Sequence, residues 1–467
     1  MKNVATLFCG KVTLLSAFFM FAAGCTAQQE KPKILQQSVK DTVSESTMLV
    51  ATIPADVTPP KPIPGHESAP AAQGQPSSFQ IIFSESGKGV AYVAGQGDGF
   101  YVMHNQERGK VYSAVGTVVL SQDGRRSAYA AEVDGKWCMV LDGQEGKRYD
   151  SVLTPAFSPD GRHIVCQGKA GDKWYMLVDG FPNEGTTASY TTPEFNSDSN
   201  LIVYTESASS INDTRLIVSD LSFRKRSVIT AIGDQLFVTN KGKNRIAAVQ
   251  LHDSKFRVVD FKFDKPDVVH EGPLYDVIEQ LALSDDGVSL SYCALKGRTR
   301  LMILDAREEL LPVGRAPELP MIRPDKKGVG ILLSLDNRIS FYQTFIGSKV
   351  KGKIYDEASN LTYSTNGSYA YAARTGNDWF VVVNGKEGTQ FDRVVDPLFS
   401  PDGRYLVYRA RKGKERFLVL ADAKDGKVIK QYPSCEQVFQ PSFLPGGKGV
   451  AYGVKDGSKL VRKVEPL

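Results

Sequence analysis

Residues 158–162 read Ser-Pro-Asp-Gly-Arg, and residues 400–404 repeat the same five letters. Pro at the second position, Asp at the third and Gly at the fourth are typical of a type I turn, in which Pro fixes φ and Gly lets the chain leave the turn without steric strain. A catalytic or phosphate-binding motif is usually present once in a chain, whereas the turn of a repeated unit recurs. We therefore interpret both copies as structural turns, made by Pro159, Asp160 and Gly161 and by Pro401, Asp402 and Gly403.

Ten segments of the chain align on this turn, from IIFSESGKGVAYVA at 81–94 to PSFLPGGKGVAYGV at 441–454. The nine intervals between successive turns average 40 residues and range from 36 to 45. Differences of this size belong in loops, so they leave the repeat intact. The first residues of the ten turns are Ser84, Ser121, Ser158, Asn196, Thr239, Ser284, Arg323, Ser364, Ser400 and Leu444.

Each unit contains the pattern of four short antiparallel strands. A short apolar strand leads into the turn, and a second apolar strand such as HIVCQG at 163–168 follows it. The third strand, for example KWYMLVDG at 173–180, ends in Asp-Gly, which is a strong signal for a tight hairpin because both turn residues need φ > 0. A fourth, more polar strand such as GKRYDSV at 146–152 completes the unit. Helical periodicity is almost absent.

Four-stranded units with this period are typical of propeller blades, because one small sheet cannot bury both of its faces without neighbours. We predict an all-β fold, a β-propeller of four-stranded antiparallel blades with about ten 40-residue units. Propellers usually have four to eight blades. One large ring, two smaller rings, or units that are not full blades remain open, and a single ring of eight to ten blades is favoured.

The last unit ends after its third strand, so its fourth strand is missing. Propellers often complete the final blade with a strand from the N-terminus, and TMLVATI at 47–53 has strand character. This stretch is either the ring-closing strand or an isolated apolar patch, and the sequence favours neither.

The first 24 residues have the features of a secretory signal. Lys2 and Lys11 are positive, and the apolar run Val12 to Ala23 is shorter than the about 20 residues of a membrane span. The following AAGC resembles the lipobox of bacterial lipoproteins, although Ala22 stands where Leu is usual. The resemblance implies a lipid on Cys25 and, because Thr26 rather than Asp follows, an outer membrane location. An ordinary cleaved signal is the alternative.

Residues 25–78 are expected to form a tether that begins with the lipid-bearing cysteine. Residues 26–78 hold eight of the 24 prolines, with much Ser, Gln, Ala and Thr. Such a composition buries too little apolar surface to offset chain entropy, so we expect disorder, with a span on the order of 40 Å. Residues 79–467 then form the propeller.

The FSPDGR turn followed by an apolar strand resembles the WD-like repeats of TolB-type β-propellers. The similarity is strongest in 153–190 and 395–437 and extends more loosely over residues 79–467. It implies the propeller fold and a periplasmic setting. A clear counterpart of the separate α/β domain of TolB is lacking, so the role of TolB in the Tol–Pal system is not carried over.

The remaining residues give few signals for chemistry. The sequence has no GxSxG, HExxH or GxxxxGK[ST] motif, and its formal net charge of +5 is not gathered into a basic block that would indicate nucleic acid. A calcium site needs six or more clustered oxygens, which one Asp per blade, as at Asp160 and Asp402, does not supply. We therefore expect no metal, no cofactor and no catalytic residue.

The cysteines and tryptophans also have structural interpretations. The cysteines after Cys25 are widely spaced without a CxxC pair, so they are either buried thiols or disulfides of unknown pairing. The three tryptophans occupy one place in three units, where packing between blades is favoured over a sugar-stacking surface. These residues are Cys138, Cys166, Cys293, Cys435, Trp137, Trp174 and Trp379.

These observations predict a monomeric, lipid-anchored propeller of the cell envelope, on the periplasmic face of the outer membrane. It would act as a protein-binding or scaffolding module without catalysis, and an envelope protein would bind one rim of the ring, where loops converge on a rigid scaffold. The alternative is a carboxylate-dependent hydrolase or a glycan-binding propeller that acts on envelope polysaccharide or peptidoglycan.

Overall fold

The computed structural model describes residues 45–53, 81–190, 193–207, 214–224, 226–230, 232–240, 244–312, 319–335, 338–344 and 350–467. All of them belong to one compact unit, Val43–Leu467. They form ten antiparallel sheets, and the 3₁₀ turn Pro445–Gly447 is the one helical element in this part of the chain. No helix among these residues has the length and apolar character needed to cross a membrane.

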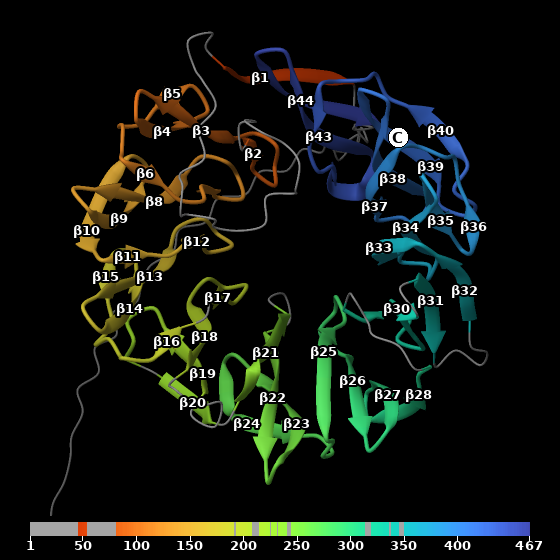
Figure 1. Cartoon of the computed structure of the whole chain (residues 1–467), viewed down its shortest axis with the longest axis horizontal. Coiled ribbons are helices and arrows are strands. Elements are labelled where there is room, and N and C mark those ends of the chain that lie inside the picture. Colours follow the sequence, from red (N-terminus) through yellow and green to blue (C-terminus); the bar gives the residue numbers. More distant parts are fainter. Residues whose placement is uncertain are drawn as a thin grey trace, which may run out of the picture. The chain divides into compact units, whose positions relative to one another are not determined.

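The ten sheets surround a central opening, so the described residues form a ten-blade β-propeller as a single ring, at the upper end of the predicted eight to ten blades (Figure 1). We number the blades 1 to 10 and call the strands of each blade A to D from the central opening outward. Blade 1 contains β2 (Ile81–Phe83), β3 (Val90–Gln96), β4 (Gly99–His104) and β5 (Glu107–Arg108), and blade 2 contains β6 (Ala114–Val115), β7 (Val119–Leu120), β8 (Ser127–Val133), β9 (Lys136–Leu141) and β10 (Gln144–Tyr149). Blade 3 contains β11 (Ser151–Val152), β12 (Ala156–Phe157), β13 (Ile164–Ala170), β14 (Lys173–Val178) and β15 (Phe181–Pro182), and blade 4 contains β16 (Ser189–Tyr190), β17 (Glu194–Phe195), β18 (Leu201–Ser207), β19 (Arg215–Asp220) and β20 (Arg226–Thr230). Blade 5 contains β21 (Ile232–Asn240), β22 (Arg245–His252), β23 (Lys255–Lys262) and β24 (Lys265–Glu271).

Blades 6 to 9 have four strands each, and blade 10 is completed by the first strand of the chain. Blade 6 contains β25 (Val277–Leu283), β26 (Leu290–Lys296), β27 (Thr299–Leu304) and β28 (Arg307–Leu310), and blade 7 contains β29 (Met321–Ile322), β30 (Val329–Leu335), β31 (Arg338–Thr344) and β32 (Val350–Tyr355). Blade 8 contains β33 (Glu357–Tyr363), β34 (Tyr369–Thr375), β35 (Asp378–Val383) and β36 (Lys386–Glu387), and blade 9 contains β37 (Arg393–Phe399), β38 (Tyr405–Lys412), β39 (Glu415–Asp422) and β40 (Val428–Gln431). Blade 10 contains β41 (Gln437–Val438), β42 (Ser442–Phe443), β43 (Gly449–Asp456), β44 (Lys459–Pro466) and β1 (Ser46–Thr52).

The Ser-Pro-Asp-Gly stretch joins strands A and B of a blade. In blade 3 the buried hydroxyl of Ser158 donates a hydrogen bond to the Asp160 carboxylate at 2.6 Å and accepts one from the backbone N–H of His163 at 2.9 Å. The N–H of Gly161 donates to the Ser158 carbonyl at 2.9 Å, and Gly161 has φ 70°, which explains the glycine. The turn therefore satisfies its polar groups internally while it reverses the chain.

The Asp-Gly hairpin between strands C and D also supports strand B. Asp179 and Gly180 have φ 50° and 83°, as a type I′ turn requires. The Asp179 carboxylate accepts a hydrogen bond from the backbone N–H of Ile164 at 2.9 Å, and the Asn384 amide oxygen accepts one from Tyr369 at 3.1 Å. One side chain thus fixes three strands of its blade.

The structure corrects the predicted fourth strand at 146–152. Strand β10 ends at Tyr149, and Asp150 already belongs to the next blade, because its carboxylate accepts a hydrogen bond from the N–H of Gly171 in the B–C turn of that blade at 2.6 Å. An aromatic residue followed by Asp marks three further blade starts, with the same bond at 2.6–2.7 Å. These are Tyr275-Asp276 with Gly297, Tyr355-Asp356 with Gly376, and Phe391-Asp392 with Gly413.

The core of the ring lies between blades. The described residues form ten hydrophobic clusters, and each cluster joins two neighbouring blades. Between blades 8 and 9, for example, Trp379 packs with Phe391, Tyr408 and Phe417. Each blade therefore shields the apolar faces of its neighbours from water, which is the dominant favourable contribution to folding.

Strand β1 closes the ring. It pairs with β44 in antiparallel register from Ser46 opposite Val464 to Thr52 opposite Lys459. Ala51 is fully buried and packs in one cluster with Tyr92 of blade 1. Of the two interpretations of the stretch at 47–53, the structure therefore has the strand, and residues 46–52 belong to the ring rather than to the predicted tether.

The cysteines and tryptophans lie mainly in the blade interfaces. Cys138, Cys166, Cys293 and Cys435 are free and buried, and burial raises the pKa of the Cys166 and Cys293 thiols to about 12. Trp379 is buried, whereas Trp137 and Trp174 are half-buried. Cys25 lies outside the described residues.

Candidate functional site

The pockets on the described surface include one of about 190 Å³ between blades 1 and 2 and two larger ones, between blades 5 and 6 and between blades 9 and 10. Pocket 5–6 has a volume of about 570 Å³, and pocket 9–10 has a volume of about 240 Å³. Pocket 5–6 is lined by Arg245, Asp260, Phe261, Lys262, Lys265, Val268, His270, Gly287 and Val288. Pocket 9–10 is lined by Arg393, Val395, Arg409, Ala410, Arg411, Arg416, Gln437 and Val438.

The two pockets lie on opposite faces of the ring. One face carries the A–B and C–D turns, and we call it the A–B face; the other carries the B–C turns and the connections between blades, and we call it the B–C face. Arg245 begins a B strand after an A–B turn, and Gly287 lies within such a turn. Arg411 and Arg416 flank a B–C turn. Pocket 5–6 therefore opens at the A–B face and pocket 9–10 at the B–C face.

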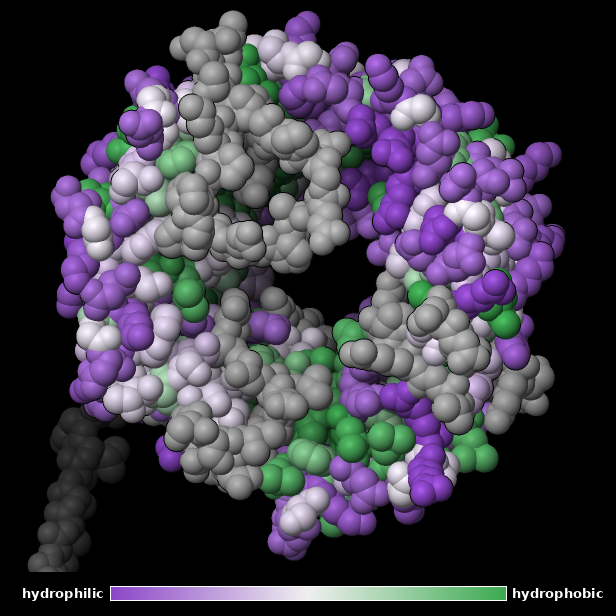
Figure 2. Space-filling view, viewed as in Figure 1, coloured by the Kyte–Doolittle hydropathy of each residue, from purple (hydrophilic) through white to green (hydrophobic). Residues whose placement is uncertain are grey.

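The surface character also differs between the two regions. On the one face of the ring that Figure 2 shows, hydrophobic residues lie over blades 5 and 6 and strongly hydrophilic residues over blades 9 and 10 beside the central opening. Val268 and Val288, which line pocket 5–6, are 58% and 61% exposed. A ligand of pocket 5–6 would meet a mixed surface, whereas a ligand of pocket 9–10 would meet arginines among small apolar residues and Gln437.

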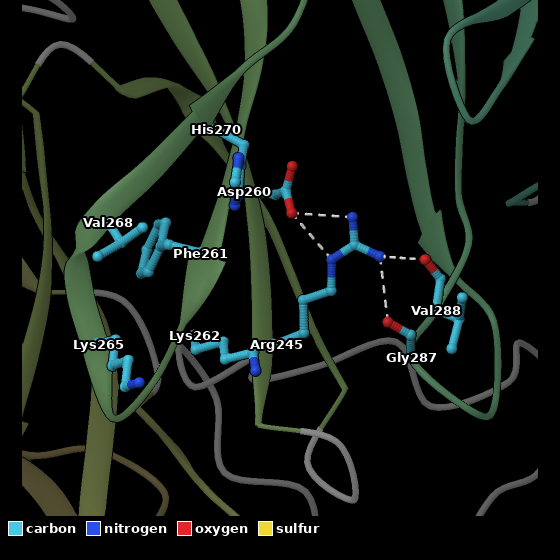
Figure 3. A pocket seen from close by; sticks show the side chains of 9 residues that line it. All are labelled: Arg245, Asp260, Phe261, Lys262, Lys265, Val268, His270, Gly287 and Val288. Carbon is cyan, nitrogen blue, oxygen red and sulfur yellow. Dashed lines mark hydrogen bonds and ion pairs between the residues drawn. The ribbon is translucent and has the colours of Figure 1, made fainter.

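In pocket 5–6 the guanidinium of Arg245 is fully engaged by its own protein (Figure 3). It forms an ion pair with Asp260 at 2.8 Å. Its Nη1 donates to the carbonyl of Gly287 at 3.1 Å and to that of Val288 at 2.5 Å. Because Gly287 and Val288 belong to blade 6, Arg245 joins two neighbouring blades.

The same arrangement recurs in blade 2. Arg126 pairs with Asp142 at 2.9 Å, and its Nη1 donates to the carbonyls of Gly161 and Arg162 in the next blade, both at 3.0 Å. A contact that repeats at equivalent positions serves the packing of the ring. Arg245 is therefore a structural residue, although it lines the larger pocket.

In pocket 9–10 the arginines are brought together by strand register. Arg411 on β38 lies directly opposite Arg393 on β37 and Arg416 on β39. Arg409 lies two residues earlier on β38 and points to the same side of the sheet, because side chains alternate along a strand. Four arginines from three strands therefore line one small pocket, although the guanidinium of Arg393 lies over the ring of Trp379 in blade 8.

The carboxylates of the innermost strands do not stand free. Glu279 pairs with Arg300, Glu357 pairs with Arg374, and Asp396 pairs with Arg409. Among the described residues no group of three or more His, Cys, Asp or Glu side chains is placed to hold a metal ion. The charged groups of the inner strands are thus largely arranged as ion pairs.

The predicted turn residues lie apart from both pockets. Pro159, Asp160 and Gly161 are in the A–B turn of blade 3, and Pro401, Asp402 and Gly403 are in that of blade 9. The Ser400 hydroxyl and the backbone N–H and side chain of Arg404 lower the pKa of Asp402 to about 2. The Pro401 carbonyl accepts a hydrogen bond from Thr365 of blade 8 at 3.2 Å. The turns therefore join blades.

Sequence reasoning missed the arginines of pocket 9–10. The stretch RARKGKER at 409–416 contains five basic residues in eight. This run was the available signal. No such signal exists for Arg393, because Arg393 becomes a neighbour of Arg411 only through the pairing of the strands.

Comparisons with known proteins concern the fold. No family model and no curated protein matches the chain. A eukaryotic initiation factor structure is similar with a TM-score of 0.45 at 13% identity, covering 75% of this chain and 97% of the other. TolB from Acinetobacter baumannii is similar with a TM-score of 0.29 at 14% identity, covering 64% and 78%. A prolyl endopeptidase has a TM-score of 0.36 at 12% identity, covering 66% of this chain and 54% of the peptidase. No activity is taken from these likenesses.

Proposed function

We propose that this protein is a lipid-anchored binding module of the cell envelope, held at the outer membrane through Cys25 and facing the periplasm. The ring would act without catalysis and bind a partner protein through its B–C face. The propeller is a rigid scaffold, and loops and turns on such scaffolds commonly carry binding.

The observation that supports this orientation is the direction of β1. Ser46 pairs with Val464 near the end of β44, and Thr52 pairs with Lys459 at its beginning. Strand β44 starts after the B–C turn and ends at the A–B face, so the chain from Cys25 reaches the ring at the A–B face. The B–C face, with pocket 9–10, is then the face farther from the point of attachment.

The position of β1 also shortens the proposed tether. Only residues 26–45 separate Cys25 from the first strand, instead of residues 26–78. Twenty residues reach at most about 70 Å when fully extended. The ring would therefore stay close to the membrane and meet partners within that distance.

Photocrosslinking in intact cells tests this proposal. A photoreactive residue replaces exposed Lys414 on the B–C face or, as the matched control, exposed Arg125 on the A–B face. We expect one specific protein adduct from position 414 and none from position 125, and Cys25→Ser should release the protein from the membrane fraction. Absence of any adduct at 414, or equal adducts at both positions, would contradict it.

The carboxylate-dependent hydrolase is the second candidate. Turnover of peptidoglycan or an envelope polysaccharide by the purified protein, lost on replacement of inner-strand acids such as Glu279, would favour it.

A further inference from the structure

The arginines of pocket 9–10 form a row of like charges across three strands. Directly paired residues of antiparallel strands have Cβ atoms about 4.5–5.5 Å apart, and like charges in such positions destabilise the sheet. Arg393, Arg411 and Arg416 occupy two successive pairs of this kind. Arg393 and Arg411 are exposed, so water and salt weaken this repulsion, and an anion bound among the arginines would weaken it further.

The protein itself compensates only part of this repulsion. Arg409 pairs with Asp396 and donates to the Val438 carbonyl at 3.1 Å, and Arg416 donates to the Glu436 carbonyl at 3.0 Å. The guanidinium of Arg393 lies over the ring of Trp379, with 3.9 Å to the centroid. The guanidinium of Arg411 has no ion pair or hydrogen bond with any residue that the structure describes.

The acids that surround the row are engaged elsewhere. The Asp392 carboxylate accepts the N–H of Gly413 at 2.6 Å, and Glu436 forms an ion pair with Lys455. Among the described residues, Asp396 is therefore the one carboxylate that forms an ion pair with an arginine of the row, and its partner is Arg409.

A second, independent observation concerns Arg409. Its Nε is buried and has no hydrogen-bond partner among the described residues. A buried donor without a partner costs about 1–3 kcal/mol, and a water molecule or a ligand that accepts its hydrogen bond would offset this cost.

We propose that pocket 9–10 binds an oxyanion, the phosphate or carboxylate group of a ligand or partner. Guanidinium groups bind both groups through paired N–H···O bonds, and these charge-assisted bonds are stronger than neutral ones. A volume of about 240 Å³ accommodates one such group rather than a large ligand. This inference rests on the proposed binding function and names the chemistry through which the B–C face recognises its partner.

Calorimetric titration of the full chain in detergent tests the proposal with two probes, inorganic phosphate and a hexaglutamate peptide, at low and high salt. The variant is Arg411→Gln, and the matched control is Arg162→Gln, because Arg162 is an arginine with an 82% exposed side chain on the other face. We expect at least one probe to bind, with about ten-fold weaker binding for Arg411→Gln and unchanged binding for the control. A preference for phosphate would identify a phosphorylated ligand, and a preference for hexaglutamate would identify an acidic protein segment.

Equal affinity of Arg411→Gln and the unchanged protein would overturn the proposal, as would the absence of binding of both probes. To show that a loss of binding does not reflect misfolding, the variant is unfolded thermally without ligand, where it should be at least as stable as the unchanged protein. If the oxyanion proposal is wrong, neither probe depends on Arg411, but the photocrosslinked adduct from position 414 still forms. Failure of the partner proposal removes the adduct while the probes still bind, so the two outcomes are distinguishable.

Discussion

Pockets 5–6 and 9–10 are both built around arginines at the boundary of two blades, but the contacts of these arginines differ. Arg245 has a carboxylate and two carbonyl groups as partners, and all of them come from the ring. Arg411 has two arginines opposite it and no partner for its guanidinium among the described residues. The larger pocket is therefore part of the packing of the ring, and the smaller one has charge to offer to a ligand. Pocket size alone would have selected a pocket whose arginine already has partners within the ring.

The largest effect is expected from Arg245→Ala. The substitution removes an ion pair and two hydrogen bonds between blades and leaves Asp260, whose side chain is 20% exposed, without its cation. We expect the free energy of unfolding to fall by about 2–3 kcal/mol, measured by urea denaturation. Arg125→Ala serves as the control and should change stability by less than about 0.5 kcal/mol. An equally small change for Arg245→Ala would remove the structural interpretation of pocket 5–6.

Acid should weaken both regions alike, because the same turn occurs in each. Hydrogen bonds from Lys326, the Ser284 hydroxyl and the Val288 N–H lower the pKa of Asp286 in blade 6. The Ser400 hydroxyl and Arg404 lower the pKa of Asp402 in blade 9 to about 2. A carboxylate with a lowered folded pKa stabilises the fold above its unfolded pKa of about 3.9, and this contribution is lost as the pH falls towards the folded value.

Urea denaturation at pH 5, 4 and 3 measures this acid response. Asp402→Asn should fold, because Asn366 takes the same place in blade 8 and accepts the hydrogen bond from Ser364. This variant should have a lower free energy of unfolding than the unchanged protein at pH 5, and it should lose less of that free energy between pH 4 and pH 3. A variant that loses stability as steeply as the unchanged protein would refute the role of this carboxylate.

Arg411→Gln should have the opposite sign to Arg245→Ala. Relief of the repulsion from Arg393 and Arg416 is expected to raise the free energy of unfolding by about 0.2–1 kcal/mol without ligand. High salt should reduce the gain, since salt screens exposed charges. A loss of stability comparable to that of Arg245→Ala would mean that Arg411 has a structural role as well.

The smallest effect concerns the reactivity of two thiols, Cys435 beside pocket 9–10 and Cys293 in the interface between blades 6 and 7. Cys435 is 9% exposed and lies 3.8 Å from the Lys463 Nζ, whereas Cys293 is 1% exposed and burial raises its pKa to about 12. Since the thiolate is the reactive form, we expect iodoacetamide to label Cys435 faster, measured by peptide mass spectrometry. The Cys435 N–H donates to the Arg416 carbonyl, so a ligand in pocket 9–10 should slow labelling of Cys435 and leave Cys293 unchanged. Faster labelling of Cys293 would contradict the difference in burial.

Most of the fold was predictable because local chemistry determines it. Pro and Gly at fixed corners and the Asp-Gly hairpins each specify a turn through φ, and the turns divide the chain into blades. The aromatic–Asp pair at the blade starts was missed. Asp150 follows directly on Tyr149 in what looked like a polar strand, and its bond to Gly171 spans 21 residues.

The arginine row was not predictable for a geometric reason. Strand β37 contains a bulge between Val395 and Leu398, where Asp396 has φ 54°. Without the bulge, the register at Phe399 and Leu406 would place Arg393 opposite Lys412, and a shift by one residue moves a side chain to the other face of the sheet. The bulge cannot be recognised in the sequence, so the pairing of Arg393 with Arg411 could not be predicted.

The pairing of β1 with β44 has a consequence for biogenesis. Ser46 is synthesised 418 residues before its partner Val464, and at about 5–20 residues per second an interval of roughly 20–80 s separates the two. Until the last residues have emerged, both strands have open hydrogen-bonding edges, which readily attract other chains. Completion of the ring therefore depends on both ends of the globular part being delivered together, and truncation at either end should leave an aggregation-prone intermediate in place of a smaller stable ring.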